Sequence, residues 1–119
     1  NADSYSDLTD IPQRVNFLKA ILKQADVTPA VQVTGANRVV AFSQKKVDEP
    51  HRLITVKSGR KTPTQFRVRM NDADPKAVYR IEDILGSMKI TMSGGHLRKK
   101  GFPAILKSYG STVYWVEKK

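Results

Sequence analysis

The residues of this sequence whose types and spacing could do chemistry are its basic side chains. Three cations follow one another in Arg98-Lys99-Lys100, and further upstream Arg67 and Arg69 alternate with apolar residues. Such alternation is typical of a strand with one charged face. Guanidinium and ammonium groups bind phosphates, and an exposed tyrosine can stack on an unpaired base. The candidate anion-binding residues are Lys57, Arg60, Lys61, Arg67, Arg69, Arg98, Lys99, Lys100, Lys107 and Tyr109.

The net charge indicates the same kind of partner. The 119 residues carry 21 Lys and Arg against 11 Asp and Glu, a formal charge of +10. Residues 1–29 hold three bases and four acids, a charge of −1, so residues 30–119 hold 18 bases and 7 acids, a charge of +11. Nucleic acid is the common polyanion that a protein of this charge binds. We expect a nucleic-acid-binding protein, with DNA ahead of RNA and duplex DNA first, in a transcriptional, replicative or chromosome-organising role.

Two other classes of partner fit this charge. An acidic protein could dock on the basic body, which would make the chain an inhibitor or adaptor, and the acidic N-terminal part could pair with the body of a second copy. RNA, or a ribosome, shares the electrostatics of DNA. The sequence leaves these alternatives open.

The groupings that could support catalysis each lack a part. The stretch SGRKT at 58–62 is similar to the end of a phosphate-binding loop, but Ile54 stands where the earlier glycine belongs. Ser93 and His96 lie three residues apart without a third group to orient them. With two histidines and no cysteine, a metal site is not expected. We therefore expect no enzyme, no cofactor and no metal.

Apolar residues spaced three and four apart predict a helix near the N-terminus. The stripe consists of Ile11, Val15, Leu18, Leu22 and Ala25. Residues 1–10 lack this period, so we expect a flexible acidic segment there.

From residue 27 the apolar period is two, which predicts strands. We expect three hairpins, the first closed by GAN, in which Gly35 and Asn37 accept a positive φ. The remaining short strand is 88–92. The paired strands are expected at 30–34 with 38–42, at 52–58 with 65–70, and at 103–108 with 112–118.

A second helix is expected within residues 71–88, where Val78, Ile81 and Leu85 keep helical spacing and Gly86 ends the pattern. The alternative is a short strand at 77–81 followed by a helical 82–88.

The segment between Leu97 and Phe102 holds the run of three cations. The two apolar residues predict buried anchors at its ends, with the cations exposed between them on a loop or short turn.

The stretch 80–118 also resembles the second half of a winged-helix domain, with a helix, a turn, a basic helix ending in Gly-Phe, and a two-stranded wing. The resemblance covers about a third of the chain, and Gly94-Gly95 departs from it where the recognition helix should run, since glycine costs roughly 1 kcal/mol in a helix. It would place His96, Arg98, Lys99 and Lys100 on a groove-facing helix, and Lys107, Ser108, Tyr109 and Ser111 at the wing.

Together these patterns predict an α+β fold of antiparallel hairpins with one or two packing helices. Residues 11–119 are expected to form a single basic domain after the acidic segment 1–10. No apolar run reaches the length that spans a bilayer, so we expect no membrane partner and a cytoplasmic or nucleoid-associated location.

Overall fold

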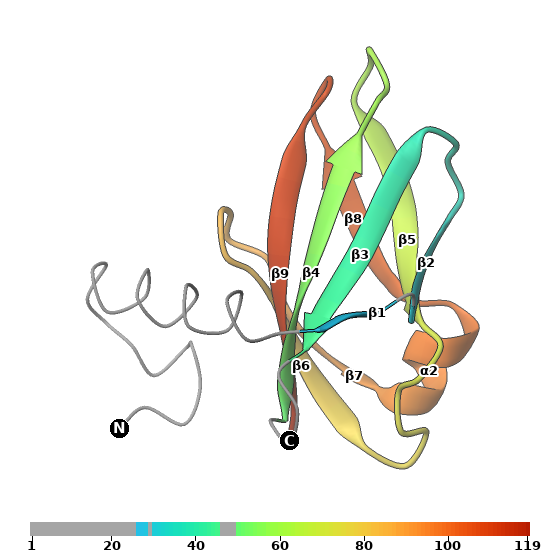
Figure 1. Cartoon of the computed structure of the whole chain (residues 1–119), viewed down its shortest axis with the longest axis vertical. Helices are drawn as coiled ribbons and strands as arrows, with labels where there is room; N and C mark the ends of the chain where they lie inside the picture. The colour runs from blue at the N-terminus through green and yellow to red at the C-terminus, as the bar shows by residue number, and fades with distance from the viewer. Residues whose placement is uncertain (1–25, 29, 46–49) are drawn as a thin grey trace.

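Two antiparallel sheets make up most of the computed structural model, which describes residues 26–28, 30–45 and 50–119 (Figure 1). Sheet A has the strand order β1-β3-β4-β9-β6-β7, and sheet B has the order β2-β5-β8. A helix, α2, connects β7 to β8. The elements are β1 Asp26–Thr28, β2 Val31–Thr34, β3 Val39–Lys45, β4 His51–Ser58, β5 Thr64–Met70, β6 Val78–Asp83, β7 Lys89–Ser93, α2 Gly94–Lys99, β8 Phe102–Leu106 and β9 Ser111–Lys118.

The core lies between the sheets and is built from alternate residues of the strands. In β5, Phe66, Val68 and Met70 are buried, as their alternation with polar residues predicts. They face Tyr114 of β9, whose ring meets that of Phe102 edge-on at 4.8 Å between centroids. Each such side chain contributes roughly 1.5–3 kcal/mol when fully buried.

The expected α+β class is wrong, because the regular secondary structure of the described residues is nearly all strand, with one helix of six residues. The second predicted helix contains strand β6 instead, in which Tyr79 and Ile81 are buried while Val78 is exposed. Period two therefore prevails over the helical spacing, and Leu85 of the supposed helical stripe is 72% exposed. The other predicted helix, at 11–25, and the segment 1–10 lie outside the described residues.

The three expected hairpins are also wrong, although their strands exist. The strands β2 and β3 are consecutive but belong to different sheets, and the same holds for β4 and β5 and for β8 and β9. An alternating pattern fixes which face of a strand is buried but not which strand pairs with it. Each connecting turn therefore crosses from one sheet to the other.

The winged-helix resemblance also fails, because the basic helix does not follow another helix. The cations Arg98 and Lys99 lie on α2, which follows a strand rather than a helix and is capped at its start by Ser93, whose Oγ accepts a hydrogen bond from His96 N at 3.2 Å. The expected anchors are confirmed, since Leu97 and Phe102 are fully buried. The cations between them are exposed on a short helix and the turn after it.

Candidate functional site

Three turns that cross between the sheets meet at one end of the sandwich, the upper end in Figure 1. Backbone hydrogen bonds tie them together. Gly59 N in the β4–β5 turn donates to Arg38 O in the β2–β3 turn at 2.7 Å, and Tyr109 N in the β8–β9 turn donates to Arg60 O at 2.8 Å. The three turns therefore form one braced surface.

This end of the molecule is strongly cationic. None of the turns at 35–38, 59–63 and 107–110 contains an Asp or Glu. The turns contain four bases, and Lys57 near the end of β4 is a fifth; within the part of the chain that the structure describes, none of the five forms an ion pair. The Arg60 guanidinium is held across two turns by a hydrogen bond from Nη1 to Asn37 Oδ1. We call this set the turn cluster; it consists of Arg38, Lys57, Arg60, Lys61, Lys107 and Tyr109.

The backbone of the turn cluster is strained at two positions. Arg38 has φ 57° and Tyr109 has φ 51°, and both non-glycine residues with positive φ in the described chain lie here. This conformation costs an L-residue about 1–2 kcal/mol. The expectation for the β2–β3 turn is half right, since Gly35 has φ 89° but Arg38 takes the second positive φ in place of Asn37. Tyr109 is 62% exposed, so its ring is available to a partner.

The other predicted cations gather around α2, near the lower end of the molecule in Figure 1. The half-buried side chain of Arg67 donates from Nε to Lys100 O at 3.1 Å and from Nη2 to Gly101 O at 2.8 Å. Arg69 Nε donates to Arg98 O at 2.8 Å. These groups satisfy carbonyls at the end of the helix, which have no partners within it. We call this set the α2 cluster; it consists of Arg67, Arg69, Arg98, Lys99 and Lys100.

The ten residues predicted from sequence thus divide into two groups of five, and Arg38 is the member of the turn cluster that the sequence reasoning missed. Its signal was its place directly after the turn residues GAN. In the α2 cluster, the two strand arginines face the helix rather than open solvent. Two arginines of the α2 cluster are thus engaged with backbone carbonyls, which makes the turn cluster the better candidate for binding a partner.

Four acidic side chains of the described residues form ion pairs away from the two clusters. Asp72 receives a bidentate interaction from Arg52, with N to O distances of 2.9 and 2.8 Å. Asp74 pairs with Lys118 at 3.2 Å. Hydrogen bonds from Lys76 N and from the Lys118 side chain lower the pKa of the Asp74 carboxyl. The remaining pairs join Glu117 to Arg80 and Glu82 to Lys89. None of these pairs involves either cluster, so the positive charge of the clusters is not cancelled by them.

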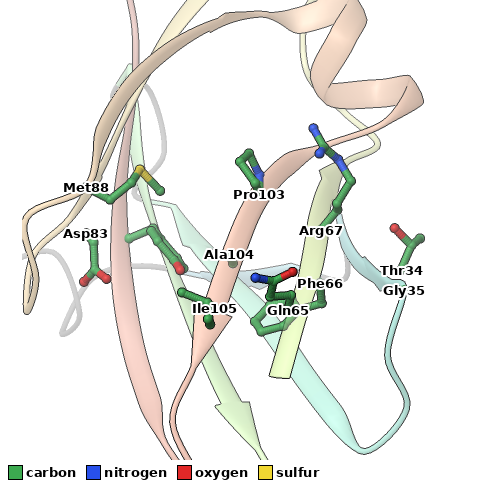
Figure 2. A pocket seen from close by; sticks show the side chains of 11 residues that line it. Thr34, Gly35, Gln65, Phe66, Arg67, Asp83, Met88, Pro103, Ala104 and Ile105 are labelled. Atoms are coloured by element: carbon green, nitrogen blue, oxygen red, sulfur yellow. The ribbon is translucent and has the colours of Figure 1, made fainter. Parts of the chain in front are cut away.

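A pocket of about 580 Å³ opens beside the edge strand β8 (Figure 2). Asp83 and Met88 lie on one side of it, and Phe66 and Arg67 lie on the other, with the Arg67 side chain turned toward α2. The Asp83 carboxylate accepts a hydrogen bond from Thr112 Oγ1 at 2.5 Å. Burial, with the nearby Asp83 charge, raises the pKa of Tyr114 to about 12, so its phenol is neutral at physiological pH. The pocket offers a mostly apolar wall and suits a phosphate less well than the turn cluster.

The described residues contain neither a cluster of potential metal ligands nor a membrane-spanning helix. These residues contain no group of three or more potential metal ligands. None of their helices has the length and apolar character that a membrane crossing requires.

Comparison with known proteins gives a likeness of fold alone. No family model matches the chain, and no curated protein does. The chain is similar to part of a solved structure described as the α-amylase from Geobacillus thermoleovorans complexed with acarbose, with a TM-score of 0.57 and 15% identity. The match covers 94% of this chain and 25% of the amylase chain, so this chain spans about a quarter of that protein. At this identity the likeness supports the fold and carries no activity with it.

Proposed function

We propose that this protein binds nucleic acid without catalysis, with duplex DNA as the first candidate, and that the turn cluster is its main contact surface. The observation that carries the proposal is that five cations stand on or beside three cross-braced turns that contain no acid. Lys and Arg side chains held in this way contact phosphates and release counterions, which supplies most of the sequence-independent affinity.

The exposed ring of Tyr109 adds a second kind of contact. It lies among the cations of the turn cluster and is available for stacking on an unpaired base, at about 1–3 kcal/mol. A duplex would use the cations alone, whereas a single strand would use both. Preference between the two forms therefore reports the contribution of Tyr109.

The test is binding of labelled duplex DNA, single-stranded DNA and duplex RNA at matched salt concentrations. For duplex DNA, the slope of log K against log salt is about −0.9 per phosphate contact, so five engaged cations predict a slope of about −4.5. Absence of binding at about 50 mM salt contradicts the proposal, and docking on an acidic partner protein then becomes the leading explanation of the charge.

A matched pair of variants locates the site. Lys61→Ala with Lys107→Ala removes two cations of the turn cluster, whereas Lys76→Ala with Lys119→Ala removes two exposed cations outside both clusters. The first variant should make the duplex DNA slope shallower by about 1.8, and the control should leave it almost unchanged. Equal slopes in the two variants would mean that the turn cluster is not the contact surface.

The α2 cluster is tested separately. The change Arg98→Ala, Lys99→Ala and Lys100→Ala removes three exposed cations without touching a turn between the sheets. If this variant no longer binds while the Lys61 and Lys107 variant still does, the contact surface is α2. A cytoplasmic or nucleoid-associated location is the expectation that goes with this proposal.

A further inference from the structure

The face of sheet A that points away from the core contains two large buried side chains. In β9, Tyr114 points toward sheet B, so its neighbour Trp115 points outward. In β4, Ile54 belongs to the core, so Leu53 also points outward and lies opposite Trp115. Yet Leu53 is 1% exposed and Trp115 is 0% exposed.

Neighbours on the same sheet flank the indole of Trp115. The ring of His51 stacks on it with 4.5 Å between centroids and 22° between planes. The carboxylate of Glu117 accepts a hydrogen bond from Trp115 Nε1 at 3.1 Å. Such neighbours rise from the strands beside the ring, whereas closing a sheet face to water requires a layer above it. Of the described elements, sheet B and α2 pack on the opposite face, where Leu97 joins the core.

We propose that the stretch 11–25 of this chain is the layer that covers this face, with the side chains of its apolar stripe against Trp115 and Leu53. The 3.6-residue spacing of Ile11, Val15 and Leu18 predicts a helix with one apolar side, which needs an apolar surface to cover. The stretch carries Arg14, Lys19 and Lys23 and no acid, a charge of +3, so the contact rests on apolar burial and not on charge attraction.

The connection and the lengths agree with this arrangement. Strand β1 starts at Asp26 and is an edge strand of sheet A. The chain that precedes it therefore joins the sheet at the border of the face to be covered. One cross-strand row runs from β1 through β3, β4 and β9 to β6, through Val27, Gln44, Leu53, Trp115 and Glu82. Four strand spacings span about 19 Å. A helix of fifteen residues, the length of the stretch 11–25, is about 22 Å long and reaches across these strands.

The extent of the cover follows from the exposed residues of the same face. Phe42 is 41% exposed and Val40 is 62% exposed, and both lie toward the turn cluster in the register of β3. The cover therefore ends before the turns and leaves the turn cluster accessible. Whatever the turn cluster binds, the face around Trp115 needs the same cover.

Because Trp115 is the single tryptophan of the chain, its fluorescence reports on the cover directly. Leu18→Asp with Leu22→Asp should shift the emission to the red and raise quenching by acrylamide several-fold, with the far-ultraviolet circular dichroism of the sheets retained. The control Gln13→Asp with Gln24→Asp adds the same charge about 180° away on the predicted helix and should change neither signal. Equal signals in the two variants would overturn the proposal.

A second measurement decides the question if the aspartate variant unfolds. The chain has no cysteine, so a small dye that tryptophan quenches on contact can be placed at Leu18→Cys or at Gln13→Cys without background labelling. Quenching that occurs at position 18, is much weaker at position 13, and disappears with Trp115→Phe supports the cover. Absence of quenching at position 18 overturns it. So does quenching or indole protection that disappears on dilution, because the layer would then be a second copy of the chain.

Discussion

Replacing Arg67 and Arg69 by alanine should destabilise the fold, although the sequence pattern alone places both on a charged strand face. Together the two side chains donate three hydrogen bonds, at 2.8 to 3.1 Å, to carbonyls at the end of α2. Net contributions of about 1 kcal/mol for each bond predict a decrease of about 3 kcal/mol in the free energy of unfolding. The double change would also leave those carbonyls without their arginine donors beside strand β5.

The matched comparison is the variant Arg98→Ala, Lys99→Ala and Lys100→Ala. It removes one more positive charge but keeps the backbone carbonyls and the arginines that bind them. Of the side-chain hydrogen bonds described for these three residues, it removes the one from Arg98 Nη1 to Ala73 O at 3.3 Å. We therefore expect its free energy of unfolding to fall by about 1 kcal/mol or less. Urea unfolding followed by circular dichroism measures both variants.

Lysines at positions 67 and 69 separate charge from geometry. They keep the positive charge but cannot reproduce the forked donation of a guanidinium, so they should restore only part of the stability. If the alanine variant unfolds at the same urea concentration and with the same slope as the parent protein, the hydrogen bonds to α2 contribute nothing and the two arginines do not stabilise the fold. The salt slope of DNA binding by the folded variant then shows whether they bind phosphates, since it becomes shallower by about one for each phosphate interaction that is removed.

Three other predictions follow from single positions. Gly101→Ala should cost about 2–4 kcal/mol in urea unfolding, because Gly101 has φ 80° and an added Cβ would lie 2.2 Å from Val68 O. Tyr109→Asn should change the free energy of unfolding by less than about 0.5 kcal/mol, because asparagine tolerates positive φ. It should also weaken single-stranded DNA binding by about 1–3 kcal/mol if the ring stacks, and unchanged affinity would exclude stacking. Because the folded-state pKa of Tyr114 is raised from 10.0 to about 12, stability should be unaffected by this group below pH 10.0 and should fall as the pH rises from there to about 12. Tyr114→Phe should remove that part of the decline in alkaline unfolding curves, and an unchanged curve would contradict it.

The sequence predicts the strands far better than their partners. Alternation in β5 identifies Phe66 and Val68 as core residues, and the structure confirms it. The same alternation is present whether the next strand pairs in the same sheet or crosses to the other, so it does not distinguish a hairpin from a turn between sheets. The stretch 71–88 misled because three apolar residues happened to keep helical spacing, and the pairing of β6 with β9 that makes it a strand lies far away in the sequence.

The candidate site shows the same division between composition and tertiary structure. Charge and turn residues indicate that the cations belong on the surface, but they do not show that Arg67 faces a helix end while Lys61 does not. That difference depends on Gly101, which follows α2, coming to lie beside β5. An interaction between segments more than 30 residues apart has no local signature in the chain.

The strain in the turn cluster is where fold and proposed function meet. Two residues with positive φ cost about 1–2 kcal/mol each where glycine would cost little. The hydrogen bonds from Gly59 N to Arg38 O and from Tyr109 N to Arg60 O each stabilise the turns by about 1 kcal/mol. Both join backbone atoms, so a glycine at either strained position would form them equally well. The arginine and tyrosine side chains are therefore not required by the turn geometry. Since Tyr109 is mostly exposed, its ring also contributes little to the core. Backbone strain at an exposed aromatic ring and at a cation, on one braced surface, is the arrangement expected of a binding site. The turn cluster is therefore a stronger candidate than the α2 cluster, in which Arg67 and Arg69 are bonded to backbone carbonyls.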